Sequence, residues 1–241
     1  MNVRELRSRL LALAREAGLP GAGVGVRRIV DTGPPPYVPD LDRGFRVSPR
    51  RRREYLAGRA AAADALAGLG LSGYPVARTP RGVPIWPPGL AGSISHSAHW
   101  AVAIAVSADV AAHCGIDVEE PADQADPAAL ELHSAREAVY KAMSPGSGLS
   151  FHPEQWPLTR STADGRWTVG QLPLGPSIPR LVSFSSRHIH VSLAVCDDAA
   201  GNSLAGVCGG EAMERTGPVP PEVGVRALFV RAMPCGGGRS G

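Results

Sequence analysis

The sequence predicts an α+β fold. Segments with apolar residues at helical spacing are mixed with short apolar runs typical of strands, without the steady alternation of a doubly wound protein. Apolar residues make up 44% of the chain, which is ordinary for a globular protein, whereas glycine (29) and proline (23) are abundant. We therefore expect packed α+β structure together with loops or a tail outside the core.

Three helices are expected. Ser48 is a good N-cap and Pro49 fits the first helical position, so this pair indicates the start of the longest helix. Ser134 and Glu137 match the S-x-x-E capping box, which predicts that another helix begins at this serine. Together with the spacing of leucines near residue 10, these signals predict helices at 3–17, 49–69 and 134–143.

Strands are expected where apolar runs are bounded by turn residues. The continuous run 100–107 is typical of a buried strand, and 114–120 is a strand with charges embedded in it. Proline and glycine favour a loop at 32–40 and a loop or broken strand at 81–90. From about residue 199 the chain lacks periodicity, so 199–241 is expected to be a disordered tail. The remaining strands are expected at 24–30, 166–172, 180–186 and 188–196.

Charge and cysteine usage argue against several classes of protein. The net charge is only +3, and four basic residues form one run, Arg50–Arg53, which suits a phosphate, a nucleic acid or an acidic partner. No nucleic-acid-binding motif accompanies the run, so no nucleic acid is expected as a partner. The four cysteines form no C-x-x-C pair, and no apolar stretch is long enough to span a membrane. We expect a cytoplasmic protein that does not contact a membrane.

Two acidic residues lie in the strand 114–120. Residues two apart in a strand face the same side, so Asp117 and Glu119 are expected to point together. Carboxylates this close repel each other, and Mg²⁺ relieves the repulsion by binding to them. An edge strand with a solvated acidic face would have the same pattern, and both readings are open at this point.

Glu137 and Lys141 lie four residues apart, on one face of the helix 134–143. One reading is a surface ion pair in which Glu137 also caps the helix. In the other reading Glu137 is a third acidic ligand or a general base, and Lys141 is a cation near developing phosphate charge. Phosphoryl transfer requires such a set of metal ligands, base and cations.

The segment 92–97 reads GSISHS and precedes the strand 100–107. The side chains of Ser95 and His96 can donate to phosphate oxygens, although a polar turn with a solvated histidine would have the same sequence. A serine–histidine nucleophile pair is disfavoured, because neighbouring side chains in an extended segment point apart and the G-x-S-x-G pattern of hydrolases is missing.

In this order, GSISHS, GIDVE and SAREAVYK resemble the signature motifs of the 4′-phosphopantetheinyl transferases, most closely the larger type that activates enterobactin and surfactin synthetases. SPRRRREYLAGRAAAADAL and RGVPIWPPGLAG extend the resemblance over roughly residues 23–196. It implies a monomer of two similar α+β halves with the site between them. Here 1–112 would bind the phosphates of coenzyme A, and 113–198 would carry the metal site and the catalytic helix.

The resemblance also implies a reaction and a role for each motif residue. The 4′-phosphopantetheine arm of coenzyme A would move to a serine of an acyl or peptidyl carrier protein, with Mg²⁺ as cofactor and adenosine 3′,5′-bisphosphate as product. Glu137 and Lys141 would be catalytic. The metal would be held by Asp117, Glu119 and Glu137. Coenzyme A would be bound by Arg51, Arg59, Arg81, Ser95 and His96.

Three features depart from the family pattern. The segment 120–133 is short where members usually have a longer stretch with a helix, which affects the expected carrier-docking wall. His133 stands where phenylalanine is usual, and Ala61 and Ala63 stand where cysteine and arginine are frequent. A second hypothesis is therefore a degenerate relative that binds coenzyme A or a carrier protein without transferring anything.

Overall fold

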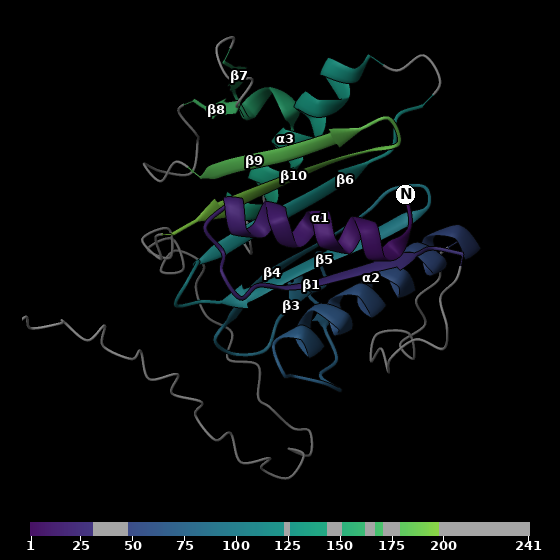
Figure 1. The fold of residues 1–241 in the computed structure, drawn as a ribbon. Helices are drawn as coiled ribbons and strands as arrows, with labels where there is room; N and C mark the ends of the chain where they lie inside the picture. The colour runs from purple at the N-terminus through teal and green to yellow at the C-terminus, as the bar shows by residue number, and fades with distance from the viewer. Residues whose placement is uncertain (31–47, 123–125, 144–150, 162–166, 171–178, 198–241) are drawn as a thin grey trace, which may run out of the picture. The chain divides into compact units, whose positions relative to one another are not determined.

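The computed structural model describes residues 1–30, 48–122, 126–143, 151–161, 167–170 and 179–197. These residues belong to one compact unit, Met1–Leu204, and contain helices packed on two three-stranded antiparallel sheets (Figure 1). The predicted α+β class is confirmed. The predicted loop 32–40 and the predicted tail 199–241 lie outside the described residues.

The first sheet has the strand order β1-β5-β4. Its strands are β1 (Gly23–Arg28), β4 (Leu90–His96) and β5 (Trp100–Ser107), and α2 (Pro49–Gly68) packs across β1 and β5. The alanine-rich face of α2 meets the alanines of β5, so helix and sheet come close together. A Cβ on Gly25 would lie 1.8 Å from the carbonyl oxygen of Ala61, so only glycine permits this approach.

The second sheet repeats this arrangement with the order β6-β10-β9. Its strands are β6 (His113–Glu119), β9 (Arg180–Ser186) and β10 (Ile189–Cys196), and α3 (Pro127–Met143) packs on β6 and β10. In each sheet the chain runs strand, helix and hairpin, and the last strand pairs with the first (Figure 1). The expectation of two similar α+β halves is confirmed, whereas their division at residue 112 stays a prediction.

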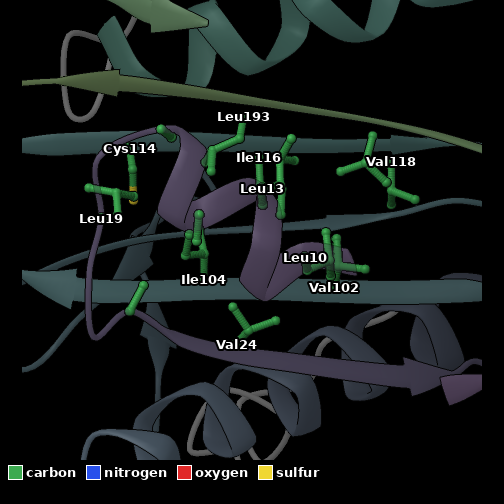
Figure 2. Close-up of a cluster of buried hydrophobic side chains, with 14 of the residues drawn as sticks. Leu10, Leu13, Leu19, Val24, Val102, Ile104, Cys114, Ile116, Val118 and Leu193 are labelled. Atoms are coloured by element: carbon green, nitrogen blue, oxygen red, sulfur yellow. The ribbon is translucent and has the colours of Figure 1, made fainter. Parts of the chain in front are cut away.

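One helix joins the two halves. α1 (Val3–Glu16) starts at Asn2, whose side chain accepts a hydrogen bond from the Glu5 amide at 2.9 Å. Its leucines pack against valines and isoleucines of β1, β5, β6 and β10 (Figure 2). Because burying one such side chain is worth about 1.5–3 kcal/mol, this shared core holds the two sheets together.

The third helix begins earlier than its sequence predicts. Asp126 accepts a hydrogen bond from the Ala128 amide at 3.0 Å through Oδ1, and Pro127 occupies the first helical position. Ser134 is therefore buried inside the helix, and the predicted capping box of Ser134 and Glu137 is wrong. The Asp-Pro pair supplies an equally good start seven residues earlier, so part of the short segment 120–133 is helical.

The remaining elements are short. They are β2 (Ala77–Arg78), β3 (Pro84–Ile85), the 3₁₀ helix Pro153–Gln155, β7 (Leu158–Arg160) and β8 (Trp167–Val169). The strand predicted at 166–172 is thus observed as three residues, and positions 166, 171 and 172 lie outside the described residues. Within the described ranges, no helix is both long and apolar enough to cross a membrane.

Candidate functional site

Serine hydroxyls join the two sheets where β4 runs beside β6. Ser93 Oγ accepts a hydrogen bond from the Ile116 amide at 3.1 Å, and Ser95 Oγ accepts one from the Val118 amide at 3.3 Å. These bonds satisfy two edge amides of β6 that would otherwise be buried without a partner. Residues 92–96 of GSISHS are therefore strand rather than polar turn, and they lie beside GIDVE. We call these two contacts the serine seam.

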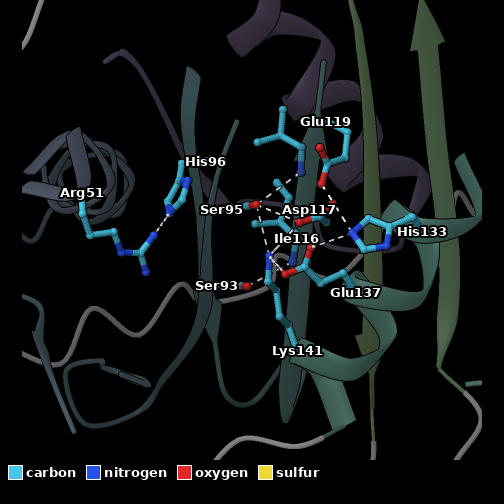
Figure 3. Close-up of polar contacts among 11 residues, drawn as sticks. Arg51, Ser93, Ser95, His96, Ile116, Asp117, Glu119, His133, Glu137 and Lys141 are labelled. Carbon is cyan, nitrogen blue, oxygen red and sulfur yellow. Dashed lines mark hydrogen bonds and ion pairs between the residues drawn. The ribbon is translucent and has the colours of Figure 1, made fainter. Parts of the chain in front are cut away.

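Asp117 lies at the centre of the site. Its side chain is 1% exposed, so the alternative of a solvated acidic face is wrong for this residue. Oδ1 accepts hydrogen bonds from Ser95 Oγ and from Lys141 Nζ, both at 2.8 Å (Figure 3). Oδ2 is buried and has no hydrogen-bond partner among the described residues. Burial alone would raise the pKa of Asp117, but the Lys141 charge and the side-chain hydrogen bonds of Asp117 together lower it.

Lys141 reaches from α3 into this centre. Besides Asp117, Nζ donates to Ser95 Oγ at 3.1 Å and to the Ile116 carbonyl at 3.2 Å. It also lies 3.5 Å from Glu137 Oε1, one helical turn away. Burial would lower the pKa of Lys141, but the charges of Asp117 and Glu137 raise it. Lys141 is thus a charged, partly buried group. Its pair with Glu137 is present, but it is partly buried and is not the only contact of Lys141, so the alternative of a simple surface pair does not describe it.

Glu119, His133 and Glu137 face one another beside this centre (Figure 3). His133 Nε2 lies 3.8 Å from Glu119 Oε1 and 3.9 Å from Glu137 Oε2. One potential ligand atom from each of the three residues lies within 4.8 Å of the other two. Burial, together with the charges of Asp117 and Glu137, raises the pKa of Glu119 to about 7. Burial also raises the pKa of Glu137. The arrangement therefore suits a cation, which would relieve the crowding of carboxylates.

A basic pocket of about 170 Å³ lies between the start of α2 and the end of β4. Arg51 Nη1 lies 2.8 Å from His96 Nε2. Because arginine can only donate, this nitrogen of His96 accepts and the ring is neutral. Burial and the Arg51 charge lower the pKa of His96, in agreement with a neutral ring. The residues that line the pocket include Arg51, Glu54, Tyr55, Arg59, Arg78 and His96.

Within this pocket, Arg59 is a nearly buried cation. Its side chain is 6% exposed and its guanidinium lies over the Tyr55 ring, 4.7 Å from the centroid. Its Nε has no hydrogen-bond partner among the described residues. Glu54 is the acid that lines the pocket, and Arg50 and Arg51 already pair with it at 2.9 and 3.3 Å. The pocket therefore presents positive charge to an anion.

The structure brings most of the predicted site residues together. Arg51, Arg59 and His96 share the basic pocket, whereas the exposed Arg81 lines the adjoining cavity of about 440 Å³ together with Lys141. Ser95 and His96 point apart, as expected of neighbours in a strand (Figure 3). Since the single O–H of Ser95 is donated to Asp117, its assignment to coenzyme A stays a prediction.

Comparisons with known proteins agree with these motifs. The family model described as 4′-phosphopantetheinyl transferase N-terminal domain matches residues 45–106. Over 169 residues the chain is 31% identical to the 4′-phosphopantetheinyl transferase Svp of Streptomyces mobaraensis, an alignment covering 59% of this chain and 69% of that relative. The chain belongs to the 4′-phosphopantetheinyl transferase family.

Two further relatives align over shorter segments. The 4′-phosphopantetheinyl transferase PptT of Mycobacterium tuberculosis is 32% identical over 142 residues, which cover 49% of this chain and 63% of the relative. Enterobactin synthase component D of Salmonella typhi is 35% identical over 133 residues, which cover 45% of this chain and 55% of the relative. The alignments therefore span just over half to about two thirds of these transferase-family relatives.

Sequence reasoning missed three residues at the site of this family member. Arg78 lines the basic pocket from β2, and Glu54 anchors its arginines. Glu54 had a detectable signal, because it lies four residues after Arg50 on a helix. His133 had a comparable signal, its spacing of four residues from Glu137, but was regarded only as a departure from the family pattern. The position of Arg78 depends on the packing of β2 and has no local signal.

Proposed function

We propose that this protein transfers the 4′-phosphopantetheine arm of coenzyme A to a serine hydroxyl of an apo acyl or peptidyl carrier protein, releasing adenosine 3′,5′-bisphosphate. Family membership and the names of the relatives support this proposal. One observation carries it: a cluster of carboxylates, built on the buried Asp117 and its charged lysine, lies one strand away from an arginine-lined pocket. Phosphoryl transfer needs both parts.

The basic pocket is proposed to bind the phosphates of coenzyme A. Arg51 and Arg59 supply charge in this pocket, Arg81 supplies charge from the adjoining cavity, and the neutral His96 ring supplies a hydrogen-bond donor through Nδ1. Arg59 is already buried against Tyr55 in the folded chain, so most of the free-energy cost of removing its charge from water precedes ligand binding. Such a preorganised cation gains more from an anion than a solvated surface arginine does.

The carboxylates Asp117, Glu119 and Glu137 are proposed to hold Mg²⁺. Their chemistry fits the ion, because Mg²⁺ prefers oxygen ligands from one or two carboxylates together with phosphates and water. The unpartnered Oδ2 of Asp117 supports the assignment, since a buried carboxylate oxygen without a donor is costly. When bound, Mg²⁺ would neutralise charge on the pyrophosphate.

Glu137 and Lys141 are proposed to move the proton and to stabilise the leaving group. The raised pKa of Glu137 makes its carboxylate a stronger base, which accepts the proton of the carrier serine. The serine oxygen forms a bond to the β-phosphorus as the bond from that phosphorus to the bridging oxygen breaks. Adenosine 3′,5′-bisphosphate leaves with that oxygen. Lys141, held by Asp117 and Ser95, stabilises the developing negative charge.

The test is incubation of the full chain with coenzyme A, Mg²⁺ and several apo carrier proteins, followed by intact-mass measurement of the carriers. We expect a gain of one phosphopantetheine on at least one carrier and loss of the gain when a chelator is added. Coenzyme A binding by calorimetry without any mass gain would favour the degenerate relative. The cytoplasmic location, the monomeric state and the absence of nucleic-acid and membrane partners remain predictions.

A further inference from the structure

His133 lies where a metal ligand would have to lie, and nothing in the family pattern assigns it that role. Its Nε2 is 3.8 Å from Glu119 Oε1 and 3.9 Å from Glu137 Oε2. Two ligand atoms that each bind one ion at about 2.1 Å can be at most about 4.2 Å apart. Both distances satisfy this limit, so one ion can contact the imidazole and either carboxylate. The ligand atoms of the two carboxylates lie within 4.8 Å of each other, so a small side-chain adjustment lets both contact the same ion.

A direct ion pair between His133 and the carboxylates explains these distances less well than a shared metal ion does. At 3.8 and 3.9 Å, Nε2 is beyond hydrogen-bond distance from both oxygens. A protonated imidazole that approached these acids for their charge would be expected to close onto one of them. Instead the nitrogen lies at nearly equal distances from the two oxygens, which fits ligands that share a common centre.

The positions of the three side chains are set by the fold. His133 and Glu137 are one turn apart on α3, and Glu119 faces them from the end of β6 (Figure 3). The imidazole also makes an edge contact with Phe151, with ring centroids 5.7 Å apart and planes at 76°. This contact limits the orientations of the ring while Nε2 faces the acids.

A nearby buried oxygen is an independent sign that a cation belongs here. Asp117 is 1% exposed, and its Oδ2 has no hydrogen-bond partner among the described residues. It is an immediate neighbour of Glu137, since a side-chain contact between the two carboxyl groups lowers the pKa of Asp117 and raises the pKa of Glu137. The cluster is therefore more than a set of exposed acids on a surface.

The nitrogen ligand changes which ion the site prefers. Mg²⁺ favours oxygen ligands and keeps several waters, whereas first-row transition ions accept imidazole readily. We propose that His133 binds the metal through Nε2 together with Glu119 and Glu137, and that this ligand makes the site prefer a divalent transition ion to Mg²⁺. The inference deepens the proposed function, on whose metal site it rests.

The test uses Mn²⁺ as the probe on the full chain without coenzyme A. We expect bound Mn²⁺ in electron paramagnetic resonance titrations, tighter binding of Mn²⁺ than of Mg²⁺ in competition, and nitrogen couplings in pulsed spectra. His133→Phe and His133→Gln should weaken Mn²⁺ binding at least about tenfold, with a smaller effect on Mg²⁺, and His133→Phe should lose the nitrogen couplings.

The matched control is His152→Phe. His152 lies 3.7 Å from a single carboxylate, Glu154, so it reproduces the histidine–glutamate pair without the second acid. This variant should keep wild-type Mn²⁺ affinity and couplings. Failure of the wild type to bind Mn²⁺, absence of nitrogen couplings in it, or unchanged affinity in both His133 variants would overturn the inference.

The outcome is separable from that of the proposed function. Mn²⁺ binding with nitrogen couplings, combined with no mass gain on any carrier, would retain the metal ligand and reject the transferase activity. A mass gain with Mg²⁺, combined with no nitrogen coupling to Mn²⁺, would do the reverse.

Discussion

At the scale of single residues, the site depends on one buried ion pair. Asp117 and Lys141 are 2.8 Å apart, and the two side chains are 1% and 21% exposed. A buried pair adds little net stability by itself, yet removing one partner leaves an uncompensated charge inside the protein. The pair therefore ties the folding of the site to its chemistry.

Lys141→Met should lower the free energy of unfolding by about 3 kcal/mol, because Asp117 is left charged and buried. Adding Asp117→Asn to this variant should restore part of the loss, since the orphaned charge is removed. Urea unfolding of the two single variants and the double variant measures the coupling. Additive losses would show that the two groups do not interact.

His190 makes a second residue-scale prediction, which concerns pH. Its side chain is 3% exposed and its ring nitrogens lie 2.7 and 3.0 Å from the hydroxyls of Ser185 and Ser192. Burial lowers the pKa of His190, so the folded state keeps the ring neutral. The unfolded chain binds the proton near the ordinary pKa of about 6.5. Stability is therefore lost as the pH falls below that value.

Replacing His190 tests this sign. Between pH 7 and pH 5 the free energy of unfolding should fall less steeply in His190→Gln than in the wild type. Denaturant unfolding across this range gives the two curves. His188→Gln, two residues away and exposed, is the control and should follow the wild-type slope. Identical slopes for wild type and His190→Gln would refute the buried neutral ring.

At the scale of elements, β4 and α3 both position side chains through β6. The serine seam connects β4 to β6, and Lys141 of α3 connects to the same serine and aspartate. α3 can lie this close to β6 because Gly115 has no Cβ. A Cβ at this position would lie only 2.0 Å from the Ala138 carbonyl oxygen. Displacement of either element would separate the groups of the site.

The two serines of the seam should differ in effect. Ser93→Ala and Ser95→Ala each leave one β6 amide without its partner, so each should cost about 1–3 kcal/mol of stability. Only Ser95 also donates to Asp117, so only Ser95→Ala should slow transfer at saturating coenzyme A. Thermal unfolding and the turnover rate separate these effects, and equal rates for the two variants would contradict the positioning role.

Gly115→Ala should displace α3 from β6, costing about 1–3 kcal/mol and most of the transfer activity, because the added Cβ cannot be accommodated. Gly68→Ala is the control: its Cβ would meet its nearest neighbour at 3.5 Å, an ordinary contact at the end of α2. Thermal unfolding and the carrier mass assay measure both. Wild-type stability in Gly115→Ala would refute the close approach.

At the scale of the whole molecule, local sequence signals predicted the helices and strands better than they predicted the contacts between them. The start of α2 was predictable because Ser48 and Pro49 act within one turn, and Ser48 Oγ does accept from the Arg51 amide at 3.2 Å. The start of α3 was not, because two adequate cap sequences compete and only packing selects Asp126. Asp117 and Glu119 were predictable as neighbours from strand periodicity.

The contacts between motifs required the folded structure. Nothing local in GSISHS indicates that Ser95 bonds Asp117, since the two sheets meet only through tertiary packing. His133 is a second example. Its proximity to Glu137 follows from helix spacing, but its proximity to Glu119 depends on how α3 packs on β6. The family motifs predicted which residues matter, and the fold determined what each one touches.

The central claim is that the Asp117-centred cluster performs phosphopantetheine transfer. The most direct measurement is the intact mass of an apo carrier protein after incubation with coenzyme A, Mg²⁺ and one of three proteins: the wild type, Asp117→Asn or Asp109→Asn. Asp109→Asn is the control, because Asp109 is exposed and lies outside the site. We predict a gain of one phosphopantetheine with the wild type and Asp109→Asn, and at least about a hundredfold slower gain with Asp117→Asn. No gain with the wild type on any carrier, or an undiminished rate with Asp117→Asn, would contradict the account.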